Sequence, residues 1–389
     1  MVAPSASASR YYRPELDVVR FLAFMLVFLH HTVPTDPDAR IDSILGSAAP
    51  ILYASARACR FGLSLFFTLS AFLICELLIR ERAIAGSVGV MNFYIRRILR
   101  IWPLYYLGVA LGAVVAYLPG GHPSDLIRMG WFVIFMGSWM AVLHGWIANP
   151  AGPLWSISVE EQFYLFAPWI VKYANRKWLY GFCSFLLLVS NAQLYHLGRV
   201  SAADNRIWPD SFVQFECFAG GILLCLVLRG RLPRIAIWQR ILLLIGAWFC
   251  WFYACFRLHT YFTHNFNPGS WPLIGGYALG ALGSILLLVA FLGVNPRLLP
   301  GWAIYLGRIS FGLYVYHEFA MYITNHFLVR HLTSIASPIL LLKASAEFGL
   351  TLLLAALSYR YFETPFLKLK RRHTAIENQP VGARSESLS

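Results

Sequence analysis

The sequence predicts an all-α integral membrane protein with about ten transmembrane helices, on the basis of three observations. Apolar residues make up 58% of the 389 residues and charged residues only 13%, whereas a soluble domain carries about 25% charged residues. Apolar runs long enough for a spanning helix, which needs about 20 residues, recur along the whole chain. Aromatic residues reach 16%, as expected where Trp and Tyr line the membrane interfaces.

Ten apolar runs are predicted to cross the membrane. They are residues 16–33, 61–79, 101–118, 154–171, 178–197, 211–228, 241–256, 272–294, 302–329 and 338–362. The segments between them are short, so we expect one membrane domain over residues 14–366. Residues 1–13 would form a cytoplasmic amino-terminal segment. Residues 367–389 are expected to be a basic and then disordered cytoplasmic tail.

An eleventh run, residues 131–147, is short and contains His144. Basic clusters decide whether it crosses, because Lys and Arg concentrate on the cytoplasmic side. If it does not cross, with the amino terminus inside, all the clusters face the cytoplasm: Arg80 and Arg82, Arg96 to Arg100, Lys172 to Lys177, Arg229 to Arg240, Arg297 and Lys368 to Arg372. If it crosses, every later cluster lies outside. We therefore predict an interfacial or re-entrant helix on the outer side, and both termini in the cytoplasm of a plasma (inner) membrane protein.

Charge and cysteine usage exclude two other classes. The net charge of +14 is spread in short clusters between apolar runs, which is typical of membrane topology rather than of nucleic-acid binding. The seven cysteines form no CxxC pair and no metal-ligand spacing, and six of them lie within apolar runs. We expect neither a disulfide framework nor a metal site.

Ionisable residues inside a span are costly and are candidates for function, and the first helix holds the best set of them. Arg20 and His31 are eleven residues apart, which at ~100° per residue places them within ~20° of the same face. Asp17 lies near the same stripe, and His30 points about 100° away. A histidine can act as the general base for a hydroxyl acceptor. The alternative is a structural histidine near the outer interface, with Asp17 and Arg20 forming an ion pair at the inner edge.

A second set of candidates lies on the predicted fourth span. Ser156, Glu160 and Tyr164 share a face at the start of the fourth span, where Glu160 would orient or charge-stabilise His31. The alternative is a helix cap at Ser156, with acidic residues in the first turn.

Arg96, Arg97 and Arg100 form a guanidinium cluster able to bind phosphates bidentately. The alternative is positive charge that only sets topology, which is the favoured interpretation of the cluster taken alone. Minor candidates are His317 with Glu318, Glu216, and Glu363 near Tyr359.

Together these sets resemble the acyltransferase family 3 membrane proteins, bacterial O-acyltransferases of polysaccharides and related surface molecules. The matching motifs are Leu16-Asp17-x-x-Arg20 with His31, Phe61-Gly62-x-x-x-Phe66-Phe67-x-Leu69-Ser70-Ala71-Phe72-Leu73, Arg97-x-x-Arg100-x-x-Pro103, Ser156-x-x-x-Glu160-x-x-Phe163-Tyr164, Ile309-Ser310-Phe311-Gly312-Leu313-Tyr314 with His317, and Ser358-Tyr359 with Glu363-x-Pro365. Each motif is weak alone, but six in order over residues 14–366 are specific. Ala71, where the family usually has Gly, and Phe311 are conservative departures.

The resemblance implies transfer of an acyl group, often acetyl from acetyl-CoA, to a hydroxyl of a saccharide or similar acceptor. His31 matches the proposed catalytic histidine and Arg20 its paired arginine. Arg97 and Arg100 match the pair proposed to engage the donor, and Glu160 matches an acidic position. The implied partners are the lipid bilayer, acyl-CoA as co-substrate and the acceptor, with no tightly bound cofactor and no nucleic acid. A transporter or flippase and a non-catalytic assembly subunit remain alternatives.

Overall fold

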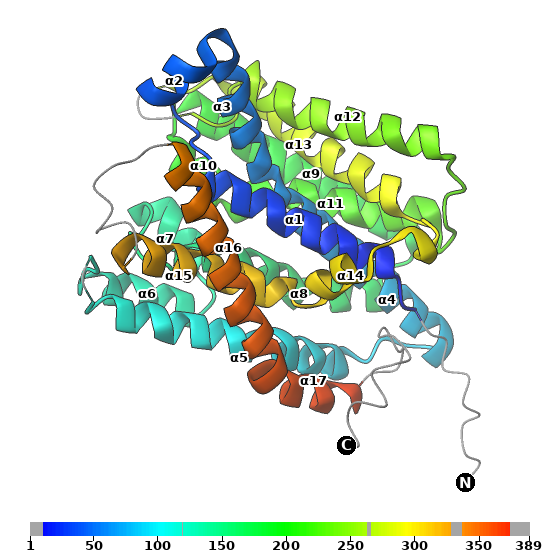
Figure 1. The fold of residues 1–389 in the computed structure, drawn as a ribbon. Coiled ribbons are helices and arrows are strands. Elements are labelled where there is room, and N and C mark those ends of the chain that lie inside the picture. The colour runs from blue at the N-terminus through cyan, green and yellow to red at the C-terminus, as the bar shows by residue number, and fades with distance from the viewer. Residues whose placement is uncertain (1–10, 119, 263–265, 328–336, 374–389) are drawn as a thin grey trace.

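The computed structural model describes residues 11–118, 120–262, 266–327 and 337–373, and within these ranges it contains helices and no strand (Figure 1). The α-helices are α1 Pro14–Thr32, α2 Ala39–Leu45, α3 Ala49–Ala58, α4 Gly62–Ala85, α5 Val90–Val115, α6 Asp125–Val133, α7 Gly137–His144, α8 Trp155–Tyr173, α9 Arg176–Arg199, α10 Asp204–Ile207, α11 Ser211–Leu228, α12 Ile237–Phe256, α13 Ser270–Phe291, α14 Gly301–Arg308, α15 Ser310–Phe327, α16 Ser337–Ser358 and α17 Thr364–Arg371. The predicted all-α class is confirmed. Residues 1–10 of the predicted amino-terminal segment and 374–389 of the predicted tail lie outside the described residues.

Six helical stretches in the described part of the chain are long and apolar enough to cross a membrane. They are Ile41–Ala85, Val90–Val115, Ser211–Leu228, Ile237–Phe256, Ser270–Phe291 and Leu341–Lys370. The protein is therefore an all-helical membrane protein, but this finding does not support the predicted count of about ten. The other predicted spans also form helices, and polar residues make them less apolar: α1, for example, carries Glu15, Asp17 and Arg20 among its 19 residues.

The segment 131–147 does not form one long helix. It contributes the end of α6 and the whole of α7, which have 9 and 8 residues, about half of what a span needs. Phe135, between the two helices, has a φ of 56°. The backbone groups left open at the end of α6 find partners on α5: Tyr105 donates to the carbonyl of Phe132 at 2.6 Å and Tyr106 to that of Val133 at 3.0 Å.

Two predicted spans are not single regular α-helices. The predicted helix 302–329 is divided at Ile309 into α14 and α15, and residues 328–329 lie outside the described residues. A Cβ on Gly307 of α14 would lie 1.8 Å from the carbonyl oxygen of Asp17, so a close contact with α1 fixes the position of this short helix. The predicted helix 338–362 continues through a π-helical turn, Tyr359–Glu363, into α17.

Helix α1 packs against α4, α13, α14 and α15 and crosses the middle of the view in Figure 1. Its side chains Val19, Ala23 and Phe24 are completely buried. A Cβ on Gly62 of α4 would lie 2.6 Å from the carbonyl oxygen of Ala23, so a glycine is needed for this close approach. Because α1 is held from several sides, its polar side chains are fixed against the neighbouring helices.

Candidate active site

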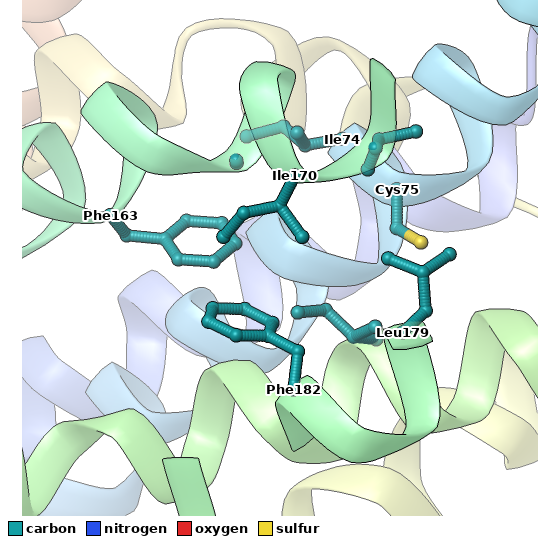
Figure 2. Close-up of a pocket in the computed structure, with 9 residues that line it drawn as sticks. Ile74, Cys75, Phe163, Ile170, Leu179 and Phe182 are labelled. Atoms are coloured by element: carbon teal, nitrogen blue, oxygen red, sulfur yellow. The ribbon is translucent and has the colours of Figure 1, made fainter. Parts of the chain in front are cut away.

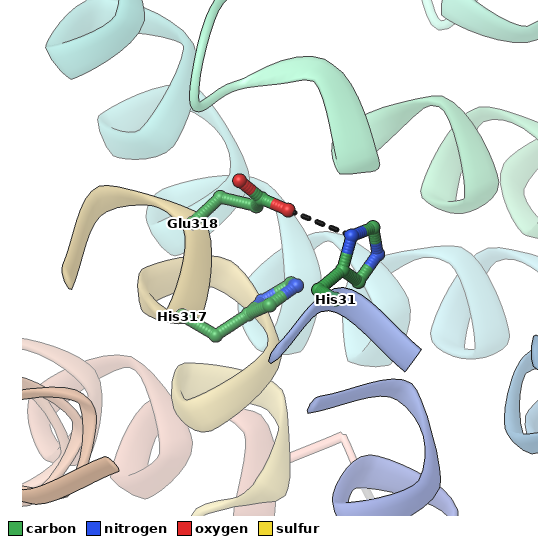
Figure 3. Close-up of side chains that lie close together, drawn as sticks. All are labelled: His31, His317 and Glu318. Carbon is green, nitrogen blue, oxygen red and sulfur yellow. Dashed lines mark ion pairs between the residues drawn. The ribbon is translucent and has the colours of Figure 1, made fainter. Parts of the chain in front are cut away.

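His31, near the carboxyl end of α1, is paired with the carboxylate of Glu318 of α15. Its Nδ1 lies 2.9 Å from Oε1 of the carboxylate, and the two side chains are 36% and 25% exposed (Figure 3). A carboxylate can only accept a hydrogen bond, so Nδ1 of the neutral ring carries the proton and donates it. The lone pair then lies on Nε2, which is the arrangement that a general base requires.

A second histidine of α15 lies beside this pair. The ring of His317 is completely buried, and its centroid is 5.3 Å from that of His31. Its Nδ1 is hydrogen-bonded to the carbonyl oxygen of Tyr314, whereas its Nε2 has no hydrogen-bond partner. Because a carbonyl only accepts, Nδ1 is the donor and Nε2 carries a lone pair. Figure 3 shows the His317 ring extending toward His31 and Glu318.

The hypothesis that Glu160 orients His31 is wrong, because the carboxylate bonded to the histidine is that of Glu318. Glu160 accepts a hydrogen bond of 2.8 Å from Tyr164, whose hydroxyl is 2.6 Å from that of Ser70 on α4. The physical reason is helical geometry: the i, i+4 pairing with Tyr164 directs Glu160 along α8. The cations that act on it are Arg97 and Arg100. Glu160 therefore belongs with the arginine cluster, and its catalytic role stays a prediction.

Ser156 links α8 to α15 rather than capping α8. Its hydroxyl is 2.7 Å from that of Tyr314 and donates to the carbonyl of Pro153 at 3.0 Å. The N-cap residue of α8 is Leu154, with no side-chain cap. Ser156 therefore supports the turn of α15 that carries His317 and does not contact His31 directly.

Asp17 and Arg20 form the ion pair that the sequence offered as an alternative. Asp17 also accepts a hydrogen bond of 3.0 Å from Tyr12. Arg20 lies about 16 Å along α1 from His31, at ~1.5 Å per residue, and does not reach the histidine. It is instead one of the charges that act on Arg100 of α5.

The three arginines of α5 have different surroundings. Arg96 is paired with Glu81 at 2.8 Å and donates to the carbonyl of His373 at 2.9 Å. The guanidinium of Arg97 lies over the ring of Tyr164 at 5.3 Å, and its buried Nε has no hydrogen-bond partner. Arg100 has no ion pair within the described ranges. Arg97 and Arg100 are thus the two members able to bind an anion.

A buried lysine joins these arginines. Lys370 of α17 is only 6% exposed, and the cations acting on it are Arg100, Arg97, Arg20 and Arg96. In the sequence, Lys370 is one of the basic residues 368–372, whose pattern predicts only the membrane topology. Its position could not be found from the pattern, because the packing of α17 against α5 places it there. We define Arg97, Arg100 and Lys370 as the inner cation cluster.

Two pockets lie away from these side chains. One, between α4, α8, α9 and α11, is lined by apolar residues and Cys75 (Figure 2), so it contains no group for acid–base chemistry. The other is a basic groove lined by Arg13, Arg231, Arg234 and Arg240. Arg240 already donates to the carbonyl of Leu292 at 2.9 Å. This groove is the second place at which an anionic ligand can bind.

Comparison with known proteins decides the family. The family model described as an acyltransferase domain, Acyl_transf_3, matches residues 13–360. The chain belongs to this acyltransferase family. Peptidoglycan O-acetyltransferase OatA of Listeria monocytogenes is 24% identical, over 96% of this chain and 60% of its own length. O-acetyltransferase OatA of Staphylococcus aureus is 22% identical, over 79% of this chain and 52% of its own length. The chain thus spans about half of the length of these relatives. No solved structure matches.

Proposed function

We propose that this member of the acyltransferase family is a membrane-embedded O-acyltransferase that moves an acyl group, acetyl in the first instance, from acyl-CoA to a hydroxyl of a saccharide or related surface molecule. The observation that carries the proposal is the 2.9 Å pair of His31 and Glu318 within a matched acyltransferase domain. This pair provides a base, because Glu318 holds Nδ1 of His31 and the lone pair on Nε2 points away from the carboxylate.

The pair of His31 and Glu318 performs the proton transfer. Nε2 of His31 accepts the proton of the acceptor hydroxyl while the oxygen attacks the thioester carbonyl carbon. The carbon–sulfur bond then breaks, and the imidazolium returns its proton to the leaving thiolate of CoA. Glu318 holds the ring through Nδ1 and stabilises the positive charge that forms on it. His31 is exposed enough, at 36%, for an acceptor to reach the ring.

The inner cation cluster binds the donor. Acyl-CoA carries its phosphates at the nucleotide end and its thioester at the end of a flexible arm. Arg97 and Arg100 have guanidinium groups that match phosphate oxygens, and the amine of Lys370 lies close to both of them. Arg20, held by Asp17, lies near Arg100 of this cluster and on the same helix as His31. A donor with its phosphates on the cluster can therefore extend its thioester toward the histidine.

The proposal includes a ten-span topology with both termini in the cytoplasm of the plasma (inner) membrane. The inner cation cluster then faces the compartment that contains acyl-CoA, and His31 faces the outside, where surface saccharides are found. The two short helices of residues 125–144 support this topology, because a segment that does not cross leaves the later basic clusters inside. The Listeria relative is named for peptidoglycan, and we propose a saccharide acceptor of this general class here.

The test is acyl transfer by the purified protein reconstituted in closed lipid vesicles. Acetyl-CoA labelled in the acetyl group is supplied on one side with a surface-glycan extract, and the products are analysed by mass spectrometry. We expect an ester-linked acetyl group with the wild-type protein and none with His31→Ala. Transport of an unmodified glycan, or transfer that survives in His31→Ala, would contradict the proposal.

A further inference from the structure

The buried lone pair of His317 has no role in the acyl transfer derived above. Nε2 of this ring has no hydrogen-bond partner, although the side chain is completely buried. A buried polar atom without a hydrogen-bond partner destabilises the folded state, so the position of this atom calls for an explanation. The direction of the ring, toward His31 and Glu318 (Figure 3), indicates what it can bind.

His31, His317 and Glu318 together present the ligand atoms of a metal site. One ligand atom from each side chain lies within 4.8 Å of the other two. Two imidazole nitrogens and one carboxylate oxygen are a donor set that binds Zn²⁺ and leaves a fourth position for water. The sequence predicted no metal site, because the ligands come from α1 and α15 and show no ligand spacing along the chain.

The surroundings of His317 are those of a metal ligand. A histidine that binds a metal through one ring nitrogen usually donates the other N–H to a carbonyl or carboxylate, which fixes the tautomer. His317 makes this contact with the carbonyl of Tyr314. The hydroxyl of Tyr314 in turn donates to the carbonyl of Pro153 at 2.9 Å. It also lies 2.7 Å from the hydroxyl of Ser156. The ring is therefore held with Nε2 directed at the cluster.

We propose that His31, His317 and Glu318 bind a divalent transition-metal ion, with Zn²⁺ the best match, and that the bound ion inhibits acyl transfer. Tetrahedral zinc holds its ligand atoms about 3.3 Å apart, given bonds of ~2.0–2.1 Å. Nδ1 of His31 and Oε1 of Glu318 are already 2.9 Å apart. The ligand nitrogen of His317 lies within 4.8 Å of these two atoms. A side-chain rotation of the partly exposed His31 can bring the three ligand atoms to the spacing that zinc requires. The exposure of His31 and Glu318 also provides the path of entry.

The inhibition follows from the tautomer of His31, and this part of the inference depends on the proposed function. In the metal-free site Nδ1 donates its proton to Glu318 and Nε2 is the base. A zinc ion on Nδ1 takes the place of that proton, which moves to Nε2 of the same ring. The ring remains neutral and loses no proton, but Nε2 no longer has a lone pair to accept the proton of the acceptor hydroxyl.

Metal binding is tested with Zn²⁺ alone on the purified full chain in nanodiscs, by isothermal titration calorimetry and by metal analysis after dialysis. We expect one zinc per chain. His317→Gln and Glu318→Gln should each weaken zinc binding at least ~tenfold. His30→Gln is the matched control, because His30 is the neighbouring histidine and is held by the carbonyl of Ala56 at 3.0 Å instead. Its zinc affinity should equal that of the wild type. Zinc binding that no triad variant changes would overturn the site.

Co²⁺ provides a second measurement if a triad variant fails to insert. The wild-type protein should give the intense visible absorption of a four-coordinate cobalt complex at one equivalent, and Zn²⁺ should remove it. Only the weak absorption of hydrated cobalt would overturn the site.

The inhibition is measured separately, as the zinc dependence of acetyl transfer. We expect the wild-type rate to fall over the same zinc concentrations as binding, and His317→Gln to need at least ~tenfold more zinc relative to its own zinc-free rate. If zinc binds at the triad but the zinc-free protein transfers no acyl group, the proposed function fails and the metal site stands. If transfer depends on His31 and zinc at binding concentrations leaves it unchanged, the inhibitory role is overturned.

Discussion

The inner cation cluster and the pair of His31 with Glu318 differ in how they are built and in what they can do. Arg97 and Arg100 come from one helix, are joined by Lys370 of α17, and have no ion pair among the described residues. His31 is paired with a carboxylate from α15, a helix that lies at the other end of the sequence. The first region can hold an anion through its guanidinium groups. The second can move a proton but carries little net positive charge for a phosphate. Binding and chemistry are therefore expected to fail independently.

The largest effect is expected from removing the base. His31→Ala should lower the rate of transfer by about 10²–10⁴-fold, the usual contribution of a general base. His30→Ala should have a milder effect, because His30 is bonded to the carbonyl of Ala56 and not to Glu318. The measurement is the initial rate of acetyl transfer at saturating acetyl-CoA, with insertion checked by fluorescence-detected size exclusion. Equal losses in the two variants would show that the pair with Glu318 does not define the base.

Glu318→Gln tests which carboxylate holds the histidine. Because an amide can still hydrogen-bond but cannot offset the charge of an imidazolium, we expect kcat to fall about 10²-fold, with the KM for acetyl-CoA unchanged. Glu160→Gln is the matched control, since Glu160 lies beside Arg97 and Arg100. It should change the KM for the donor more than kcat. The reverse pattern in steady-state kinetics would restore Glu160 as the partner of the histidine.

How far the sequence predicts these two regions depends on the origin of their residues. The i, i+4 relation of Glu160 and Tyr164 was visible along one helix, and the hydrogen bond between them is present. The contact between His31 and Glu318 was not visible, because it depends on how α1 packs against α15. The same limit explains Lys370, which reaches the arginines only through the packing of α17 on α5. Helices α2 and α3 were also missed, because their stretch has no long apolar run of its own.

Arg97→Lys combined with Arg100→Lys separates phosphate binding from the setting of topology. Both substitutions keep the positive charge, but lysine lacks the planar pair of donors that binds phosphate bidentately. We expect normal insertion and an affinity for acyl-CoA that is roughly 10- to 100-fold weaker. The control is Arg231→Lys with Arg234→Lys in the basic groove. If only the groove variant weakens binding of acyl-CoA in nanodiscs, the donor site lies there and not at α5.

The smallest effect is expected at Lys370. Lys370→Gln replaces the buried amine beside Arg97 and Arg100, and the two arginines remain, so we expect about a three- to tenfold rise in the KM for acetyl-CoA. Lys368→Gln removes a charge from an exposed neighbour on the same helix and should leave the KM unchanged. Equal effects of the two substitutions on KM would mean that α17 contributes only general positive charge.

The separation of donor binding from chemistry is tested most directly by measuring both in the same two variants. Equilibrium binding of acetyl-CoA and single-turnover transfer at saturating acetyl-CoA are compared for His31→Ala and for Arg97→Lys with Arg100→Lys. We expect His31→Ala to bind acetyl-CoA with wild-type affinity and to transfer almost nothing. The arginine variant should bind weakly and, once saturated, transfer at close to the wild-type rate. Loss of acetyl-CoA binding in His31→Ala, or a saturated arginine variant that transfers as slowly as His31→Ala, would contradict the division between the two regions.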